Sequence, residues 1–411
     1  MKYFTEYKKP ILICIGFLFF MGMIKAQDLS GAKLLLQQKD YARAKETLDS
    51  LLLANGANAV TWLLKADIYN AINKDANARN LVADAGQEAF IALQKAMQLD
   101  AGEVSTQLKA NGFDLPFDLY NNFTNTGLTF FNAGVERNDK PNYLHALNNF
   151  KQAGLVSRYI YANGWGLAAL DTLNLYYTSK AAINADKEED AILNCKKIAD
   201  AFITETAAQT DFETFYQWLV YYYNAKQDER NFYKYAEVGM KAFPNSSYFT
   251  LSYIDWYRQQ KDYTNLLAQY KILFAKDDAN FKYELYYFND IFSYLYQNKL
   301  TIDNRAGYES QLSKGLLQYI KLNPVNADAR LLLAKLYINQ ATNVFKESLL
   351  RSTTDVKIMN GYKTAQRNLL LKANVHLKQI ANKRGAISKA IYDEAKGLLV
   401  LNNVTLKRFQ Y

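Results

Sequence analysis

The residues of this sequence that could do acid–base, nucleophilic or metal chemistry are few and scattered. The two histidines, His145 and His376, lie far apart in the chain, so they lack the spacing of a metal-binding pair. Cys195 has no second cysteine nearby with which to form a thiolate cluster. The run Asp186–Asp190 could supply paired carboxylates for general acid–base catalysis. It falls in an expected turn, however, where acidic residues stabilise the start of the next helix.

Sequence motifs of known catalytic chemistry are also missing. No glycine-rich loop follows a strand pattern, and neither GxSxG nor HExxH occurs. We therefore expect a protein that is not an enzyme and that binds no cofactor and no metal. In this interpretation Cys195 is a buried, inert thiol, and His145 fills a helix surface or interface. An enzyme built into the scaffold stays open as an alternative, and its sign would be a pocket joining an acidic residue to His145.

The amino-acid composition indicates which secondary structure would carry a functional site. Half of the 411 residues are hydrophobic, while only five prolines and 18 glycines interrupt the chain. Few helix breakers, with Ala, Leu, Lys and Gln throughout, predict an all-helical protein. The net charge of +9 is uneven, because residues 346–411 carry 13 basic and four acidic residues. Residues 27–345 carry 32 basic and 35 acidic residues, so a slightly acidic body precedes a basic end.

The first 26 residues have the pattern of a signal peptide. Lys2, Lys8 and Lys9 precede the apolar run Ile11–Ile24, and Ala26 offers a small residue for cleavage. The run is too short for an ordinary membrane span, although an uncleaved anchor is the alternative. We therefore expect an exported protein, periplasmic or secreted. Cleavage near Ala26 would leave a single cysteine and no intramolecular disulfide.

A repeat of 34 residues is clearest from Glu213 to Asn280. When eight marker positions are shifted by 34 residues, seven of them remain apolar, aromatic or small. The markers are Tyr216, Leu219, Val220, Tyr223, Phe232, Ala236, Gly239 and Pro244, and the shifted positions are Thr250, Tyr253, Ile254, Tyr257, Leu266, Tyr270, Leu273 and Asp278. A fixed period of this length predicts stacked helical hairpins.

Related units cover most of the remaining chain. We expect about seven to eight of them over residues 27–340, some with insertions, and a basic helical cap over residues 341–411. The cap would contain helices near 341–350, 356–383 and 386–402, and would cover the last apolar face of the array. Irregular connections are expected at Asn73–Asn80, at a linker containing Gly112 and Pro116, at an enlarged loop over Arg137–Asn142, and at Asn298–Arg305.

The spacing of these residues resembles the tetratricopeptide repeat. In that family the first helix of each unit carries a bulky residue, a Leu, a small residue and a Tyr, and the second carries Ala, an aromatic or Leu, and Ala. Ala59–Gln98 fits this pattern with Trp62, Ala66 and Tyr69, then Ala89, Leu93 and Ala96. The resemblance covers roughly residues 29–340. It implies a right-handed α-solenoid of stacked helical hairpins.

The resemblance also implies where a partner would bind. First-helix positions of the family commonly line the concave face of the solenoid. Transferred by register, they give Leu63, Asp67, Asn70, Gln217, Tyr221, Asn224, Tyr248, Asp255, Arg258, Leu285, Asn289, Phe292, Leu331 and Lys335. Of these we take as binding candidates Asn70, Tyr221, Asn224, Tyr248, Asp255, Arg258, Asn289 and Lys335. The family's clamp for peptide carboxylates pairs Lys with Asn, and the matching basic residues are mostly missing here.

The expected function is a non-catalytic scaffold that binds a protein or peptide partner on this concave face. Many tyrosines could instead stack on sugar rings, which leaves a glycan-binding protein of helical-repeat type as the alternative, or could simply pack between helices. Nucleic acid is not an expected partner of an exported protein. Lys357, Lys363, Arg367 and Lys378 share one helix face, which could contact anionic lipid headgroups, cell-wall polymer or an acidic protein. The same residues are also consistent with a solvated polar face of the cap. The sequence does not indicate the oligomeric state.

Overall fold

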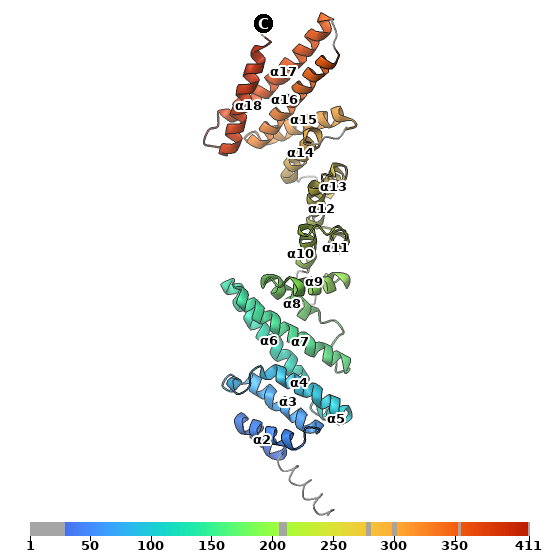
Figure 1. The fold of residues 1–411 in the computed structure, drawn as a ribbon, viewed down its shortest axis with the longest axis vertical. Coiled ribbons are helices and arrows are strands. Elements are labelled where there is room, and N and C mark those ends of the chain that lie inside the picture. The colour runs from blue at the N-terminus through green and yellow to red at the C-terminus, as the bar shows by residue number, and fades with distance from the viewer. Residues whose placement is uncertain (1–28, 205–211, 277–280, 298–301, 352–354, 410–411) are drawn as a thin grey trace, which may run out of the picture. The chain divides into compact units, whose positions relative to one another are not determined.

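The computed structural model describes residues 29–204, 212–276, 281–297, 302–351 and 355–409. Over these residues the chain forms helices joined by turns and contains no strand, which confirms the predicted all-α fold (Figure 1). None of the described helices is long and apolar enough to span a membrane. The expected signal peptide lies outside the described residues and stays a prediction. The chain divides into two compact units, Met1–Leu219 and Val220–Tyr411.

The first unit is a series of helix pairs. After a helix over residues 29–37 come α2 (Tyr41–Ala54), α3 (Ala59–Lys74), the 3-10 turn η1 (Arg79–Leu81), α4 (Ala85–Leu99), α5 (Ala101–Ala110), α6 (Asp114–Arg137), α7 (Lys140–Ala162), α8 (Thr172–Asn184) and α9 (Glu188–Asp200). Consecutive helices pack on each other most extensively in the pairs α6–α7 and α3–α4, and α8 also packs on α9. These pairs are the helical hairpins that the repeat predicts.

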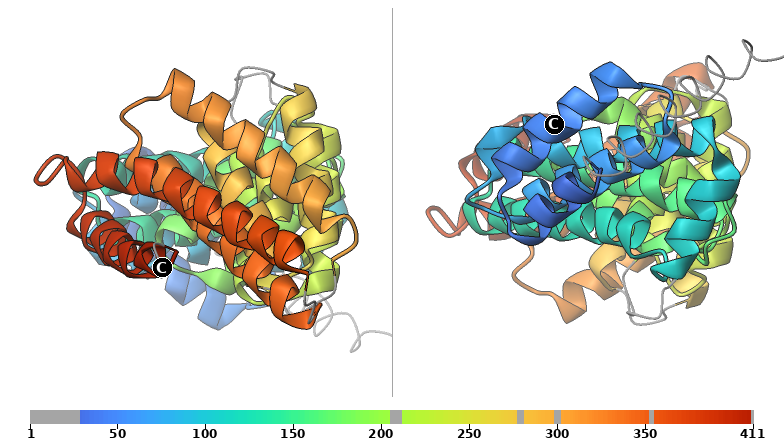
Figure 2. Two further views of the ribbon diagram at one scale, coloured as in Figure 1. Left: turned by 90° about the horizontal axis from the view of Figure 1, so that it is seen from above. Right: turned by 90° about the horizontal axis from the view of Figure 1, so that it is seen from below.

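The second unit continues the same plan. Its boundary falls inside α10 (Glu213–Ala225), which is followed by α11 (Glu229–Ala242), α12 (Tyr248–Gln260), α13 (Tyr263–Lys276), α14 (Phe281–Tyr296), α15 (Arg305–Leu322), α16 (Ala327–Leu350), α17 (Val356–Ala381) and α18 (Lys389–Lys407). Hairpin partners again pack on each other. The long helices α16, α17 and α18 lie alongside one another at the carboxyl end (Figures 1 and 2).

Short polar side chains determine where many helices begin. An Asp, Asn or Ser immediately before the helix accepts a hydrogen bond from a backbone N–H of the first turn, which satisfies a donor with no partner inside the helix. Such caps are Asp40, Asn58, Asp100, Asp139, Asp171, Asp228, Asn326, Asp355 and Ser388. The Asp186–Asp190 run lies at the turn into α9, as expected, with acidic residues in the first turn of that helix.

The repeat positions form the core. Most of the marker residues of the 34-residue repeat are buried, among them Tyr216, Leu219, Phe232 and Leu266 at 0% exposure. Small residues allow close packing within and between hairpins. Gly127 in α6 leaves room for the ring of Phe150 in α7, which occupies the space that a Cβ would take. Gly239 in α11 leaves room in the same way for the ring of Phe249 in α12. The residues that recur every 34 positions are therefore mostly the ones that pack in the core.

Two of the expected irregular connections are wrong. Most of the expected linker around Gly112 and Pro116 is helical, because α5 occupies Ala101–Ala110 and Pro116 lies in the first turn of α6, where its missing N–H costs nothing. No enlarged loop exists at Arg137–Asn142. The extra residues lengthen α6 and α7, which are joined by Asn138 and Asp139 alone.

The expected end of the repeat domain at residue 340 falls inside α16, which runs unbroken to Leu350. The helix near 341–350 is thus the second half of α16 and not a separate cap helix. The expected break between the helices near 356–383 and 386–402 is confirmed, since α17 ends at Ala381 and α18 begins at Lys389. The limits of the repeat domain and cap stay a prediction.

Candidate functional site

The residues selected from the sequence lie on the first helices of successive hairpins. They comprise Asn70 in α3, Tyr221 and Asn224 in α10, Tyr248, Asp255 and Arg258 in α12, Asn289 in α14, and Lys335 in α16. Asn70 belongs to the first unit, and the other seven belong to the second.

In the second unit, Tyr221 is the most exposed of the candidate tyrosines, with 66% of its surface in solvent. Tyr248 is half-buried, and burial is the main cause that raises the pKa of its hydroxyl. Ser252 opposes this shift through a hydrogen bond, while the nearby Asp255 and Tyr221 raise the pKa further. Tyr221 of α10 and Asp255 of α12 therefore both lie within electrostatic range of the Tyr248 hydroxyl.

A chain of side-chain amides borders these residues. Gln259 Nε2 donates to Asn224 Oδ1 over 3.3 Å, and Gln227 Nε2 donates to Gln259 Oε1 over 2.7 Å. Gln260 Nε2 in turn donates to Gln227 Oε1 over 2.8 Å. None of the three glutamines was among the residues predicted to bind a partner. Gln227 precedes Gln259 and Gln260 by 32 and 33 residues, close to one repeat length. This spacing was the available signal, because it places Gln227 just after α10 and the other two at the end of α12.

Arg258 has a different role from the one expected. Its Nε and Nη2 atoms contact the two carboxylate oxygens of Asp290 on α14, at 3.0 Å to Oδ1 and 2.9 Å to Oδ2. Tyr270 completes the group by donating its hydroxyl proton to Asp290 Oδ2 over 2.7 Å. Asp255 also pairs with Arg258. The guanidinium is thus occupied in neutralising a carboxylate that is only 6% exposed, and it is not free to bind a ligand.

The remaining candidates of this unit are less suited to binding. Asn289 is exposed, and its amide donates to the Leu285 carbonyl of its own helix over 2.8 Å. Lys335 forms a 2.5 Å ion pair with Glu394 of α18. Register transfer also fails at Phe292 and Leu331, which are 9% and 5% exposed and belong to the core.

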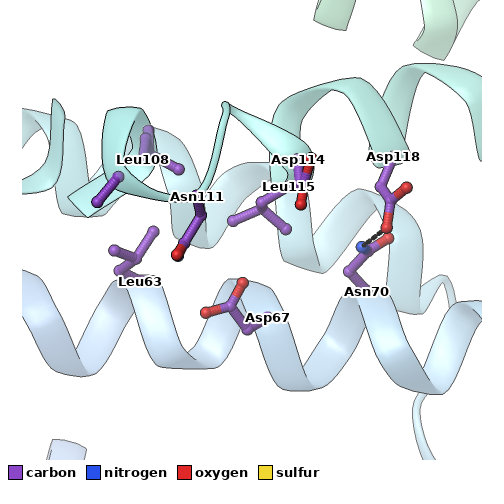
Figure 3. A pocket seen from close by; sticks show the side chains of 9 residues that line it. Leu63, Asp67, Asn70, Leu108, Asn111, Asp114, Leu115 and Asp118 are labelled. Atoms are coloured by element: carbon purple, nitrogen blue, oxygen red, sulfur yellow. Dashed lines mark hydrogen bonds between the residues drawn. The ribbon is translucent and has the colours of Figure 1, made fainter. Parts of the chain in front are cut away.

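Asn70 of the first unit is part of a polar cavity between α3 and the α5–α6 connection (Figure 3). The cavity has a volume of about 480 Å³. Its walls are Leu63, Asp67, Asn70, Leu108, Ala110, Asn111, Asp114, Leu115 and Asp118. Asn70 is 6% exposed and donates weakly to Asp118 Oδ2, at 3.5 Å, while accepting from Asn122 over 3.1 Å.

Asp67 projects into the same cavity (Figure 3). Burial raises the pKa of its carboxyl to about 6, and the positive charge of Lys33 opposes the shift only in part. Asp118, by contrast, is paired with Lys74 over 2.6 Å. Repeat register identified Asp67 and Asn70, but it could not predict the burial of Asp67 or the contribution of α5 and α6 to the cavity.

The groups considered for catalysis are dispersed. His145 is exposed and stacks on Phe130 with the ring centres 5.0 Å apart. His376 stacks on Tyr337 at 6.2 Å, and burial, helped by Arg330, lowers its pKa to about 4. Burial raises the pKa of the Cys195 thiol to about 12, which confirms a buried, unreactive cysteine. Within the described part of the chain, no three His, Cys, Asp or Glu side chains are grouped as metal ligands.

Comparison with known proteins adds little to this geometry. No protein-family model matches the sequence. No curated protein matches it either. Among solved structures, the chain is similar to one titled "Crystal Structure of P58(IPK) TPR Domain", with 11% identity over 92% of this chain and 98% of that chain and a TM-score of 0.24. Because identity and TM-score are both low, this likeness carries no conclusion about function.

Proposed function

We propose that this protein is a non-catalytic scaffold that binds a protein or peptide segment on the second unit. The binding surface would be the α10–α12 face, formed by Tyr221, Asn224, Tyr248, Asp255 and Gln259. The observation that carries the proposal is the exposed ring of Tyr221 beside Tyr248 and Asp255 of the next hairpin. A tyrosine with two rotatable bonds supplies a large contact area at low entropic cost, and tyrosines are enriched among residues that dominate binding energy.

The amides of this face suit an extended peptide. A side-chain amide offers two N–H donors and a carbonyl acceptor, which match the alternating groups of a peptide backbone. Asn224 and Gln259 already hydrogen-bond to each other, which orients both amides and leaves further donors and acceptors for a partner. Because these hydrogen bonds already restrict both side chains, binding a partner would cost less side-chain conformational entropy.

Electrostatics argue against a clamp for peptide carboxylates. Arg258 is the basic residue among the candidates on α10 and α12, and it is bound to Asp290 and Asp255. Asp255 adds a negative charge to the exposed face. We therefore propose an internal segment of a partner rather than its carboxyl terminus, with neutral or basic side chains next to Asp255.

The test is site-specific crosslinking in the native cell. A photoreactive phenylalanine analogue would replace Tyr221 in the full chain, and crosslinked partners would be identified by mass spectrometry. The matched control places the analogue at Tyr161, which is 50% exposed on α7. A partner enriched at Tyr221 and absent at Tyr161 supports the proposal.

Binding of that partner would then be measured with Tyr221→Ala/Asn224→Ala. This variant leaves Arg258 in place, because its loss would disturb the core. We expect affinity to fall at least about tenfold, equivalent to 1.4 kcal/mol. Undiminished binding by a variant with unchanged helicity would refute the assignment to this face.

The exposed rings of Tyr221 and Tyr286, at 66% and 60%, also favour a second candidate, a glycan-binding protein. Tyrosine rings stack on sugars and amides bind hydroxyl groups. A glycan array probed with the wild type and with Tyr221→Ala/Asn224→Ala separates the two functions. Retention on a polysaccharide that this variant loses would favour the glycan.

We also propose that the protein is exported after removal of residues 1–26, as the leader pattern suggests. Amino-terminal sequencing of the protein from fractionated native cells tests this proposal. A mature chain that begins at or near Gln27 in an extracytoplasmic fraction is expected. An intact leader in a protein confined to the cytosol would contradict it.

A further inference from the structure

A small cavity of the first unit lies between α7, α8 and α9, where α8 packs on both of the other helices. Its volume is about 180 Å³. Side chains spaced three or four and seven positions apart line it from α7 and from α9, so each helix contributes one face. Among them are Lys151, Leu155 and Arg158 on α7, and Asp190, Leu193 and Lys197 on α9. Together these six residues define the α7–α9 cavity.

The two helix faces are in register, with 39 residues between Lys151 and the Asp190 that it binds. Lys151 Nζ lies 2.8 Å from Asp190 Oδ1, so this first pair has opposite charges. Two turns further along both helices, the same register pairs Arg158 with Lys197. Burial, together with the positive charge of Arg158, lowers the pKa of Lys197. The second pair therefore consists of two cations that repel each other at the same cavity.

No acidic side chain neutralises this second pair. Within the residues that the structure describes, neither Arg158 nor Lys197 forms an ion pair, and the one carboxylate lining the cavity is bound by Lys151. Both cations are exposed, so a ligand can reach them. Like charges held together disfavour the folded state, and a bound anion would remove that repulsion. Two positive charges are thus available to a ligand.

The uncharged polar side chains of the cavity are already hydrogen-bonded within the protein. Asn174 of α8 donates to the Phe150 carbonyl over 3.0 Å. Thr178 donates to the Asn174 carbonyl over 2.7 Å. Asn194 of α9 donates to the Asp190 carbonyl over 2.8 Å. The two cations are therefore the groups of the cavity that most need a partner.

A glycine and two leucines shape the space around these cations. A Cβ at Gly154 would lie 2.9 Å from Asn174 Oδ1 and 3.7 Å from Arg158 Nη1, so the missing side chain keeps room beside the guanidinium. Leu155 and Leu193 also line the cavity, and they are 44% and 53% exposed. They offer apolar surface next to the positive charges.

We propose that the α7–α9 cavity binds the phosphate group of a small phosphate monoester through Arg158 and Lys197. A phosphate monoester carries a charge of about −1.5 to −2 at pH 7, which matches two uncompensated cations. The planar guanidinium of Arg158 can bind two phosphate oxygens, while Lys197 adds a point charge. The organic part of the ligand would contact Leu155 and Leu193. This cavity lies in the first unit, so the proposal does not depend on the proposed function.

Other anions fit the cavity less well. A carboxylate or a phosphodiester carries a single negative charge and would leave one of the two cations uncompensated. Size limits the ligand too, because the cavity is smaller than the roughly 300–1,000 Å³ of sites that enclose drug-sized molecules. It therefore suits a phosphate group with a small substituent.

Isothermal titration calorimetry on the full chain tests the proposal, with phenyl phosphate as the probe. We expect binding that weakens as salt is raised. Arg158→Gln/Lys197→Gln should lower the affinity at least about tenfold, because both charges are lost. The matched control is Arg137→Gln/Lys109→Gln, which removes one exposed Arg and one exposed Lys elsewhere in the first unit. This control should change the affinity by less than about twofold.

Two further probes identify the chemistry of the ligand. Benzoate has the same ring with a single negative charge, and it should bind at least about tenfold more weakly than phenyl phosphate. Inorganic phosphate should also bind more weakly, since it has no ring to contact Leu155 and Leu193. Leu155→Ser/Leu193→Ser should therefore weaken the binding of phenyl phosphate and leave that of inorganic phosphate unchanged.

Thermal unfolding keeps the result interpretable if a variant is unstable. Without ligand, Arg158→Gln/Lys197→Gln should be at least as stable as the wild type, because the change removes a repulsion between like charges. Phenyl phosphate should raise the unfolding temperature of the wild type and not that of this variant. Lys197→Gln alone leaves α7 unchanged and should weaken binding in the same direction.

Several outcomes would overturn the proposal. They include no binding of millimolar phenyl phosphate by the folded wild type, and undiminished binding by folded Arg158→Gln/Lys197→Gln. Equal affinity for benzoate would show a site for any anion, and equal affinity for inorganic phosphate would exclude an organic ligand. Binding to phosphatidic acid vesicles that depends on both cations, without binding of phenyl phosphate, would assign the cavity to a lipid headgroup.

Discussion

Arg258 on α12 holds the carboxylate of Asp290 on α14 through two hydrogen bonds, Nε to Oδ1 at 3.0 Å and Nη2 to Oδ2 at 2.9 Å. Asp290 is 6% exposed, so its charge depends on this guanidinium and on the Tyr270 hydroxyl. The carboxylate raises the pKa of Arg258, and burial together with Asp290 raises that of Tyr270. The contact fixes the first helices of two successive hairpins to each other.

Replacing Arg258 by Ala should destabilise the protein by about 1–3 kcal/mol. The change leaves the Asp290 charge buried, although the partial exposure of Arg258 lets water reduce the penalty. Urea unfolding followed by circular dichroism measures the loss. Arg258→Ala/Asp290→Leu should recover part of it, because no unpaired charge stays buried. An unchanged midpoint for Arg258→Ala would show that the ion pair is dispensable.

Replacing Asp67 by Asn should stabilise the protein at pH 7 by about 1–3 kcal/mol. The folded-state pKa of about 6 lies above the ordinary value, so the unfolded chain releases this proton more readily. The stability associated with protonated Asp67 is complete below pH 3.8 and is lost as the pH rises through 6. The increase in unfolding free energy caused by Asp67→Asn should therefore shrink as the pH falls from 7 to 4. An equal increase at both pH values would contradict this prediction. Denaturation at each pH measures this difference.

His376 should make the second unit less stable in mild acid. Its folded-state pKa of about 4 lies below the ordinary 6.5, so the unfolded chain binds this proton first as the pH falls. The stability associated with neutral His376 is present above pH 6.5 and is lost between 6.5 and 4. Between pH 7 and pH 5 we expect a loss of about 1–2 kcal/mol.

The measurement compares wild type with His376→Phe, which keeps an aromatic ring against Tyr337 and removes the titrating nitrogen. The difference in unfolding free energy between the two should change over this pH interval. His145→Phe, at an exposed position, serves as the matched control. A pH dependence that persists unchanged in His376→Phe would assign the effect to other groups.

Gly239→Ala should destabilise the hairpin contact between α11 and α12 by about 1–3 kcal/mol, because a Cβ there would overlap the ring of Phe249. Phe249 is fully buried and cannot turn out into solvent. Gly361→Ala is the control, since no atom lies within 4 Å of its would-be Cβ. That change should stabilise α17 by about 0.5–1 kcal/mol. Thermal unfolding compares the two, and a stable Gly239→Ala would imply looser packing than described.

The sequence was a reliable guide to core packing. The period of 34 identified buried positions such as Leu219, Phe232 and Leu266 because helical hairpins in contact must repeat their small and apolar residues at a fixed spacing. It was less reliable where helices could lengthen. Nothing in the local pattern distinguished an enlarged loop at Arg137–Asn142 from two long helices, since the same polar residues suit both.

Burial and pairing of polar residues were decided by the tertiary structure. The sequence alone established the helical class, the repeat spacing and an exposed Tyr221 beside buried Tyr223. It could not show that Arg258 is bound to Asp290, because that contact joins residues from two different hairpins. Nor could it show the burial of Asp67, which depends on α5 and α6. Periodicity fixes which side of a helix faces the core, whereas the charge environment of a side chain depends on which other helices surround it.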